Sequence, residues 1–337
     1  MRRPQEGSVS VLVLVLLTLL AAAAGGAASL LQVSLRYLRA SEDASAMRRS
    51  LEREADRVLA ALAADPTPGS DSPLDPVWSV LAVPEGDGVA LELDDVSSAL
   101  DPNWVQKNLF NNTGLASLLR SPEAADELQQ RREDRGFSLD LPEAYGDLFA
   151  EGVLDRYCTA YGTANINVTD EFALRTLYTL RTGDAAAAEA FHARVRQLLR
   201  EQRVLRPDEL QAFLGLGYDA LYPVMNAEPC MNVHFLDPVI LTELLAYPAL
   251  AVPHPQESAL AILESRTRSE LSGTELPRLI AAPAASRIYQ YLGVVTWFWR
   301  LTVAAPNARL ELVVARVPGP LGEPARFQIV EERYGRS

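Results

Sequence analysis

The sequence predicts an α+β protein in which a long N-terminal helix packs on an antiparallel sheet and a large, mainly α-helical domain is inserted into that sheet. Three observations predict this arrangement. An apolar run near the N-terminus continues into an amphipathic helix, three segments with period-two patterning close the chain, and a mostly helical block separates them from an earlier strand. With 337 residues and 48% hydrophobic content, the chain can bury one large core or two modest ones.

The first expected element is an apolar helix that directly follows a short charged leader. Residues 1–7 form the leader, and residues 9–31 form an apolar run of about 23 residues, or about 35 Å of helix. That length is enough to cross a hydrocarbon core of about 30 Å, and the two arginines of the leader favour a cytoplasmic N-terminus. The alternative is a cleaved secretory signal, for which the small residues 21–28 offer cleavage sites.

An amphipathic helix is expected to continue from the apolar run. Residues 32–64 contain no proline or glycine, and apolar residues recur there at a three-four spacing between charged side chains. The segment 65–69, which holds two prolines and a glycine, ends the pattern. The prediction is one helix of more than fifty residues over 8–64, half in lipid and half against a soluble domain. The apolar stripe consists of Leu35, Leu38, Met47, Leu51, Ala55, Val58 and Leu62.

The remaining elements follow from local patterning. Short β-like runs are expected at 77–83 and 89–93, and the segment 101–287 is expected to be mainly helical. Its clearest helical pieces are 122–135, 170–181, 184–202, 207–214, 237–246 and 255–270. Three antiparallel strands close the chain, at 296–303, 309–316 and 326–331.

These elements predict five parts. They are the leader (1–7), the N-terminal helix (8–64), the first part of an α/β domain (65–100), the helical insert (101–287) and the closing strands (288–337). Strands on both sides of the helical block favour an insertion, and two domains in series is the alternative topology.

A weak repeat lies inside the expected insert. The segment 165–177 resembles the segment 230–245, and each has an Asn-Val step followed by a helix with leucines at helical spacing. The asparagines aligned in this way are Asn167 and Asn232, whose side chains are expected to cap or bridge backbone N–H groups in a turn.

Composition excludes several classes of function. The net charge of −13 argues against binding nucleic acid, which needs a basic surface. Two cysteines exclude a disulfide-rich scaffold; Cys158 and Cys230 either pair in an oxidising compartment or remain two buried thiols.

No catalytic constellation is expected, so the chain is predicted not to be an enzyme. The three histidines share no ligand or triad spacing, and there is no phosphate-binding loop or nucleophile elbow. His192 is expected at the surface of a polar helix, and His234 is expected in the turn of the second repeat.

Taken together, these features resemble the minor pseudopilin K family of the bacterial type II secretion system (general secretion pathway protein K). The leader ending in Gly7 looks like a prepilin peptidase site, with Ser8 as the first mature residue. The turns 166–168 and 231–233 look like the Ile-Asn-Val motifs of the family's helical insert, and 296–301 with 327–333 look like its closing strands. If Ser8 is the first mature residue, the fifth is Leu12, where most pilins carry a glutamate; family K is recognised by the lack of that glutamate.

The resemblance implies a pseudopilin fold and a place at the tip of a periplasmic pseudopilus, where the protein would start or cap assembly and support protein export. It implies a single-pass inner-membrane protein with a methylated N-terminus and most of its chain in the periplasm. The implied partners are other minor pseudopilins, prepilin peptidase, the inner-membrane secretion platform and the secreted substrate.

The resemblance also makes calcium a possible ligand, although its binding residues stay unknown. Hard cations need several oxygens from a loop, which the set Asp94, Asp95 and Asp101 or the set Asp71, Asp75 and Asp87 can offer. Neither set has the spacing of a calcium loop, and acidic loop residues are usually solvated.

Two other functions stay open as alternatives. One is a membrane-anchored periplasmic DNA receptor with helix-hairpin-helix-like repeats, against which the acidic charge and the single lysine argue. The other is a minor pilin of a type IV pilus, which the large helical insert disfavours.

Overall fold

The structure is a computed structural model that describes residues 6–86, 88–222, 224–317 and 326–335. The chain falls into two compact units, residues 1–53 and residues 54–337. The side chains of residues 6–12, 19, 21–29 and 135 lie outside the description.

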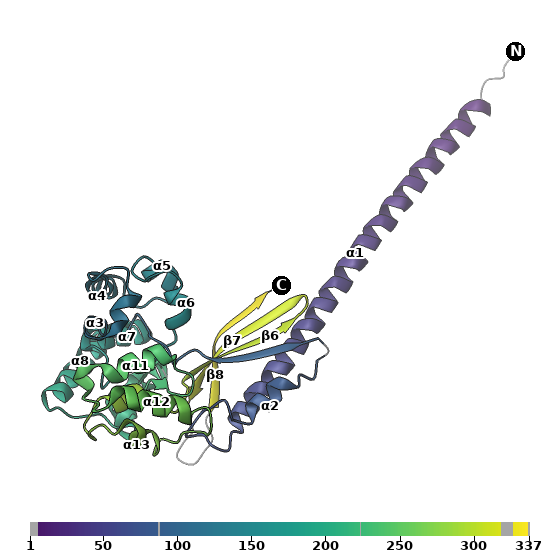
Figure 1. Cartoon of the computed structure of the whole chain (residues 1–337). Helices are drawn as coiled ribbons and strands as arrows, with labels where there is room; N and C mark the ends of the chain where they lie inside the picture. Colours follow the sequence, from purple (N-terminus) through teal and green to yellow (C-terminus); the bar gives the residue numbers. More distant parts are fainter. Residues whose placement is uncertain (1–5, 87, 223, 318–325, 336–337) are drawn as a thin grey trace. The chain divides into compact units, whose positions relative to one another are not determined.

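Helix α1, Glu6–Ala63, confirms the expected single helix and has 58 residues (Figure 1). Its described large apolar side chains from Val13 to Leu38 are solvent-exposed, with Leu30 at 71%, whereas Leu51 is fully buried. Within the described residues, no helix combines the length and the apolar character that crossing a bilayer requires. The membrane span over residues 9–31 therefore stays a prediction.

The end of α1 belongs to the second unit and is held by its neighbours in that unit. Ala55, Val58 and Leu62 are buried, as the three-four spacing predicts. The buried Glu54 carboxylate accepts the backbone N–H of Gly86 at 2.7 Å and the Nε of Arg57 at 3.0 Å. The chain then turns at Asp65, whose Oδ1 accepts the N–H of Thr67, and the following prolines prevent further helix.

A four-stranded antiparallel sheet is built from both sides of the helical block. Its order is β1-β6-β7-β8, and β1 pairs with β6 from Ala90 opposite Ala304 to Asp95 opposite Trp299. Figure 1 shows β6, β7 and β8 side by side. The strands are β1 Ala90–Asp95, β6 Phe298–Ala305, β7 Ala308–Val317 and β8 Arg326–Gly335. A bulge at Val313/Val314 shifts the register of β7 against β8. The three closing strands and the first strand are thus confirmed.

The expected strand at 77–83 is wrong, because α2, Val77–Ala82, is a helical turn and a half. A short apolar run fits a buried helix as well as a strand. Pro76 precedes it and fixes a helical φ, and Trp78 then packs edge-on against Trp299 at 6.3 Å between ring centroids.

The segment between β1 and β6 is mainly helical, as expected. Its helices before the first repeat are α3 Lys107–Asn111, η1 Gly114–Leu118, α4 Ala124–Arg135, α5 Leu141–Tyr145 and α6 Val153–Tyr157. The later ones are α7 Glu171–Thr182, α8 Ala185–Arg200, η2 Pro207–Glu209, α9 Leu210–Leu214, η3 Gly215–Gly217, α10 Tyr218–Leu221, α11 Pro238–Ala246, η4 Pro248–Leu250, α12 Pro255–Ser265, α13 Leu276–Ile280 and α14 Ile288–Tyr291.

Two tandem repeats organise the later part of this block. In repeat 1 (164–226) the short strand β2, Ala164–Asn165, pairs in parallel with β3, Met225–Asn226. In repeat 2 (231–293) β4, Met231–Asn232, pairs in parallel with β5, Leu292–Gly293. Each strand of repeat 1 precedes its counterpart by 67 residues (164 to 231, 225 to 292). Each pair of strands closes a group of helices, so the expected repeat is present as two whole structural units.

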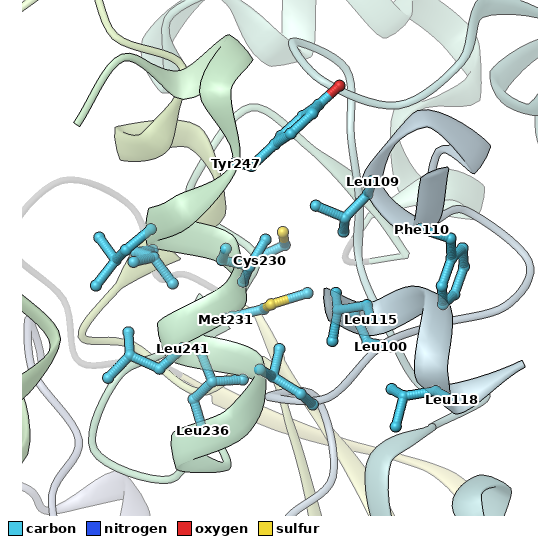
Figure 2. Packing of buried hydrophobic residues seen from close by; sticks show 14 of the residues in the cluster. Leu100, Leu109, Phe110, Leu115, Leu118, Cys230, Met231, Leu236, Leu241 and Tyr247 are labelled. Carbon is cyan, nitrogen blue, oxygen red and sulfur yellow. The ribbon is translucent and has the colours of Figure 1, made fainter. Parts of the chain in front are cut away.

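Each repeat has its own hydrophobic core. The core of repeat 1 is built around Leu174, Phe191 and Leu214 and also takes in Trp104. The core of repeat 2 is larger because α3, η1, α4 and α5 join it; Figure 2 shows Leu109, Phe110, Leu115 and Leu118 facing Cys230, Met231, Leu236 and Leu241. The helical block is therefore two small halves with helices added to the second.

Candidate functional site

An asparagine occupies the same structural position in each repeat. The strand pairing matches a different pair of asparagines from the pair that the sequence alignment matches. Asn165 and Asn232 occupy the same position, and each accepts through Oδ1 the N–H of the residue two places on, at 2.9 and 3.0 Å. Asn167 is therefore the counterpart of His234 and not of Asn232, so the alignment of Asn167 with Asn232 is wrong by two residues. The sequence offers two asparagines in an Asn-x-Asn step, and only the strand pairing distinguishes them.

The side chains of Asn167 and His234 make equivalent hydrogen bonds to distant backbone groups. The Oδ1 of Asn167 accepts the N–H of Leu205 at 2.8 Å, and its Nδ2 donates to the carbonyl of Leu205 at 3.0 Å. The Nε2 of His234 accepts the N–H of Leu271 at 3.0 Å. Burial lowers the pKa of His234, which favours the neutral ring that this acceptor role requires. The expected turn role of His234 extends to this long-range contact.

The Nδ2 groups of the two anchor asparagines bind different parts of the chain. Asn165 donates to the carbonyls of Glu228 and Gln290 at 2.7 and 2.9 Å. These bonds connect repeat 1 to the segment between the repeats and to the end of repeat 2. Asn232 donates to the carbonyl of Asp71 at 2.8 Å and to the Oγ1 of Thr296 at 3.0 Å. Asn232 thus joins repeat 2 to the segments that flank the sheet.

Around Asn232 lies a buried polar junction, formed by Asp71, Asp95, Ser98, Thr296 and Arg316. The Asp95 carboxylate accepts Thr296 Oγ1 at 2.7 Å and Ser98 Oγ at 2.5 Å. The Nη2 of Arg316 pairs with Asp71 at 2.7 Å, and both side chains are at most 5% exposed. The N–H of Thr296 donates to the other oxygen of Asp71 at 2.7 Å.

Burial controls the protonation of both carboxyl groups in the junction. It raises the pKa of Asp71 to about 7, although Arg316 and the N–H of Thr296 act in the opposite direction. It also raises the pKa of Asp95, against the hydrogen bonds from Ser98, Thr296 and Ser97. Both carboxylates and both Nη groups of Arg316 have partners, while the buried Nε of Arg316 has none, so the arrangement is suited to fixing the helical block on the sheet.

A candidate cation site adjoins this junction. Within the described parts of the chain, one group of three carboxylates, Asp65, Asp71 and Asp75, brings oxygen atoms within 4.8 Å of one another. Burial raises the pKa of Asp75 to about 6, against hydrogen bonds from Ser72. Three such carboxylates repel one another when ionised, and hard oxygen ligands suit calcium. The donor set fits a divalent cation as part of a larger shell.

The expected acidic sets are therefore only partly brought together. Asp71 and Asp75 are neighbours, whereas Asp87 lies outside the described residues. Asp101 points elsewhere: its carboxylate accepts the N–H of Asn103 and of Gly162 at 2.9 and 3.0 Å. Asp65 was missed because it was assigned to the helix-ending loop, although it lies six residues before Asp71 in the same proline-rich segment.

The two cysteines are free thiols in this structure. Burial raises the pKa of both, that of Cys230 to about 12. Cys230 belongs to the core of repeat 2, and Cys158 packs against it. They behave as small apolar residues, and their pairing stays a prediction.

The expectation for His192 is wrong. It is 7% exposed on α8, and its ring lies tilted against that of Phe172 at 5.2 Å between ring centroids. Phe191 and Val195 are buried on the same helix and belong to the core of repeat 1, so His192 lies at the edge of that core.

The expected processing residues lie at the start of α1. The backbones of Gly7 and Ser8 are helical, while the side chain of Ser8 is outside the described residues. Cleavage between them would leave nearly the whole helix on the mature chain.

Comparison with known proteins gives a structural likeness and no family. No family model matches this sequence, and no curated protein matches it. Among solved structures, a crystal structure of the GspK-GspI-GspJ complex from the enterotoxigenic Escherichia coli type 2 secretion system is similar at 14% identity. The match covers 88% of this chain and 99% of that chain with a TM-score of 0.34, which is too low to assign a fold by itself.

Proposed function

We propose that this chain is a minor pseudopilin at the tip of a type II secretion pseudopilus, where it starts or caps assembly and supports protein export. One observation carries the proposal: a leader-like Gly7–Ser8 junction stands at the very start of a 58-residue helix that runs into an α+β unit. Cutting there keeps the helix as an anchor and packing element. An ordinary secretory signal is removed together with its apolar core.

The arrangement of the second unit supports the same proposal. Its sheet is formed by a strand before the helical block and three strands after it, so the block is an insertion in an antiparallel sheet. This agrees with the layout implied by the resemblance in sequence. Support comes from the residues of this chain, since the structural likeness at a TM-score of 0.34 carries no weight.

The proposed setting is the inner membrane, with the second unit in the periplasm and other minor pseudopilins as partners. Leu12 would be the fifth mature residue, and a leucine there fits a tip subunit, which has no preceding subunit whose N-terminal amine needs a carboxylate. Prepilin peptidase, the secretion platform and the secreted substrate complete the proposed partners.

The first experiment is N-terminal sequencing and intact-mass measurement of the protein recovered from membranes of its native host. We expect a start at Ser8 with a methylated amine. Gly7→Val should leave the leader attached, whereas Gly69→Val, at an open loop position with no atom within 4 Å of an added Cβ, should be processed normally.

Two results would overturn the proposal. One is a mature start between Ala27 and Ser29 with the protein in the soluble fraction, as for an ordinary exported protein. The other is a Gly7→Val protein with the same mature mass as the parent, because it would then be cut normally. A mature mass that differs only by the glycine-to-valine change would count equally, because residue 7 would then remain on both mature chains.

A further inference from the structure

A pocket of about 340 Å³ opens on repeat 1, outside the junction and the acidic cluster. It lies between the segment 103–108, the end of α4 and the first turns of α7. One wall is an aromatic pair, Trp104 and Phe137, stacked at 5.4 Å between ring centroids. Phe172, which is 49% exposed, and the buried Leu177 add apolar surface. A concave site with aromatic walls and a few polar groups is typical of a binding pocket.

The internal repeat shows what the same helix face does elsewhere in the chain. Moving 67 residues along, α7 positions Ala173, Thr176 and Leu177 correspond to α11 positions Ile240, Glu243 and Leu244. In repeat 2, Ile240 and Leu244 are fully buried. In repeat 1, Ala173 is half-buried and Thr176 is exposed. Leu177, the counterpart of Leu244, is only 2% exposed, so the face of α11 is covered and its counterpart on α7 is open at Ala173 and Thr176.

The cover in repeat 2 is a turn of the chain itself. The N–H of Gly114 donates to the Glu243 carboxylate at 2.6 Å, and a Cβ added at Gly114 would meet that carboxylate at 2.6 Å. Leu115, the next residue, is fully buried in the core of repeat 2, to which Met231 also belongs (Figure 2). A glycine-leucine turn therefore contributes one backbone donor and one apolar side chain.

The open pocket of repeat 1 offers the complementary groups for a second turn of this kind. Two carboxylates line it, those of Glu133 on α4 and Asp170 at the start of α7. The Oδ1 of Asp170 accepts two helix N–H groups and one Glu133 oxygen accepts Gln129, which leaves acceptor capacity on both carboxylates. The aromatic wall and Leu177 offer the apolar surface.

We propose that this pocket binds a turn from another protein chain that presents a leucine-type side chain next to a glycine with a free backbone N–H. The leucine side chain enters between the Trp104–Phe137 wall and α7, and the N–H group bonds to Glu133 or Asp170. The binding mode copies the contact of Gly114 and Leu115 with α11. The site goes beyond the proposed function and does not depend on it.

The probe is the heptapeptide Thr-Gly-Leu-Ala-Ser-Leu-Leu, which is residues 113–119 of this chain, labelled for fluorescence anisotropy. The full chain is held in lipid nanodiscs, since detergent would compete for an apolar pocket. We expect saturable binding with a Kd below about 1 mM, the weak end of specific recognition. The same peptide with L115D should bind at least about tenfold more weakly, because a charge cannot enter the apolar wall.

Two pocket variants and one matched control locate the binding. Ala173→Phe fills the pocket and Phe172→Ala removes part of its wall, so both should weaken binding at least about fivefold. Ala193→Phe makes the same change as the first variant at an exposed position of α8 and should bind like the parent. A circular dichroism melt of each variant checks that it is folded.

No saturable binding up to 1 mM peptide overturns the proposal. Unchanged affinity in folded Phe172→Ala and Ala173→Phe proteins also overturns it, since the peptide would then be displacing the native turn in repeat 2. An unprocessed N-terminus would contradict the proposed secretion role, but it would not contradict peptide binding at this pocket.

Discussion

At the residue scale, three buried side chains hold distant parts of the backbone together. Asn165 and Asn232 each form an Asx turn and reach across to another segment, and His234 accepts a backbone N–H from Leu271. Buried polar groups of this kind are costly when any partner is lost. Single substitutions there should therefore report on the fold more sharply than surface changes do.

The repeat itself supplies a substitution for His234. Its counterpart Asn167 makes the equivalent contact, with Leu205, so His234→Asn should keep repeat 2 folded with a loss of at most about 1 kcal/mol at pH 8. The measurement is urea unfolding followed by circular dichroism. His234→Leu, which cannot accept the N–H of Leu271, should lose more stability than His234→Asn; the reverse order would contradict the assigned contact.

The same variant tests pH dependence. Burial holds the folded-state pKa of His234 below its ordinary value of about 6.5, so the unfolded state binds the proton first as pH falls. His234 should therefore cost stability as pH drops below about 6.5, by at most about 1.4 kcal/mol per pH unit. His234→Asn should show less acid destabilisation than the parent between pH 7 and 5. The exposed His254→Asn is the control and should follow the parent.

Asp75 tests the candidate cation site. Calcium at 100 times its Kd should raise the stability of the folded state by about 2.7 kcal/mol, and Asp75→Asn should reduce that gain. Burial raises the pKa of Asp75 to about 6 and that of Asp71 to about 7, so protons compete and the gain should shrink below about pH 7. Thermal melts with and without calcium measure it. An equal calcium shift in Asp75→Asn and in the exposed control Asp155→Asn would rule out this site.

At the element scale, α7 and α11 begin in the same way. Asp170 caps α7 by accepting the N–H of Phe172 and Ala173, and Asp237 caps α11 by accepting the N–H of Val239 at 2.8 Å. Each cap comes five residues after the anchor asparagine of its repeat. The segment from the anchor asparagine to the capped helix is thus a local structural unit that occurs twice in the sequence.

Removing either cap should destabilise the protein by a similar amount. Asp170→Ala and Asp237→Ala should each cost about 1 kcal/mol, within the range of about 0.5–2 for lost caps. The matched variants Asp170→Asn and Asp237→Asn retain an accepting oxygen and should cost less. Urea unfolding of the four variants measures the differences; alanine variants as stable as the asparagine ones would show that the side chains do not cap.

At the scale of the whole second unit, the helical block and the sheet are joined in two ways. The pairing of β1 with β6 closes the sheet across the insertion, and Asn232 links repeat 2 to Asp71 and Thr296. This connection makes the block and the sheet one unit even though two hydrophobic cores serve the repeats.

Breaking the second link should therefore affect the entire unit. Asn232→Ala leaves the carbonyl of Asp71 and the hydroxyl of Thr296 without this donor and should cost about 2–4 kcal/mol. Urea unfolding gives the size, and limited proteolysis should show faster cleavage than in the parent. The exposed Asn108→Ala is the matched control. A loss no greater than in the control would mean that the junction does not hold the block on the sheet.

Much of the secondary structure was determined by the sequence alone, because helix and strand periodicity are local properties. The single helix through residue 63, the helices that start after Asp170 and Asp237, and the closing strands all follow from spacing and capping residues. The expected strand at 77–83 is wrong because such a short, mostly apolar run carries no decisive period, and packing on Trp299 selects the helix.

Contacts between distant residues were decided only by the tertiary structure. The sequence indicated a repeat, but strand pairing between residues more than 60 positions apart decided that Asn165, and not Asn167, matches Asn232. The same holds for the meeting of Asp65 with Asp71 and Asp75, and for the pocket on repeat 1. Periodicity describes one element at a time, whereas these sites arise where segments remote in sequence are packed together, which composition and spacing do not encode.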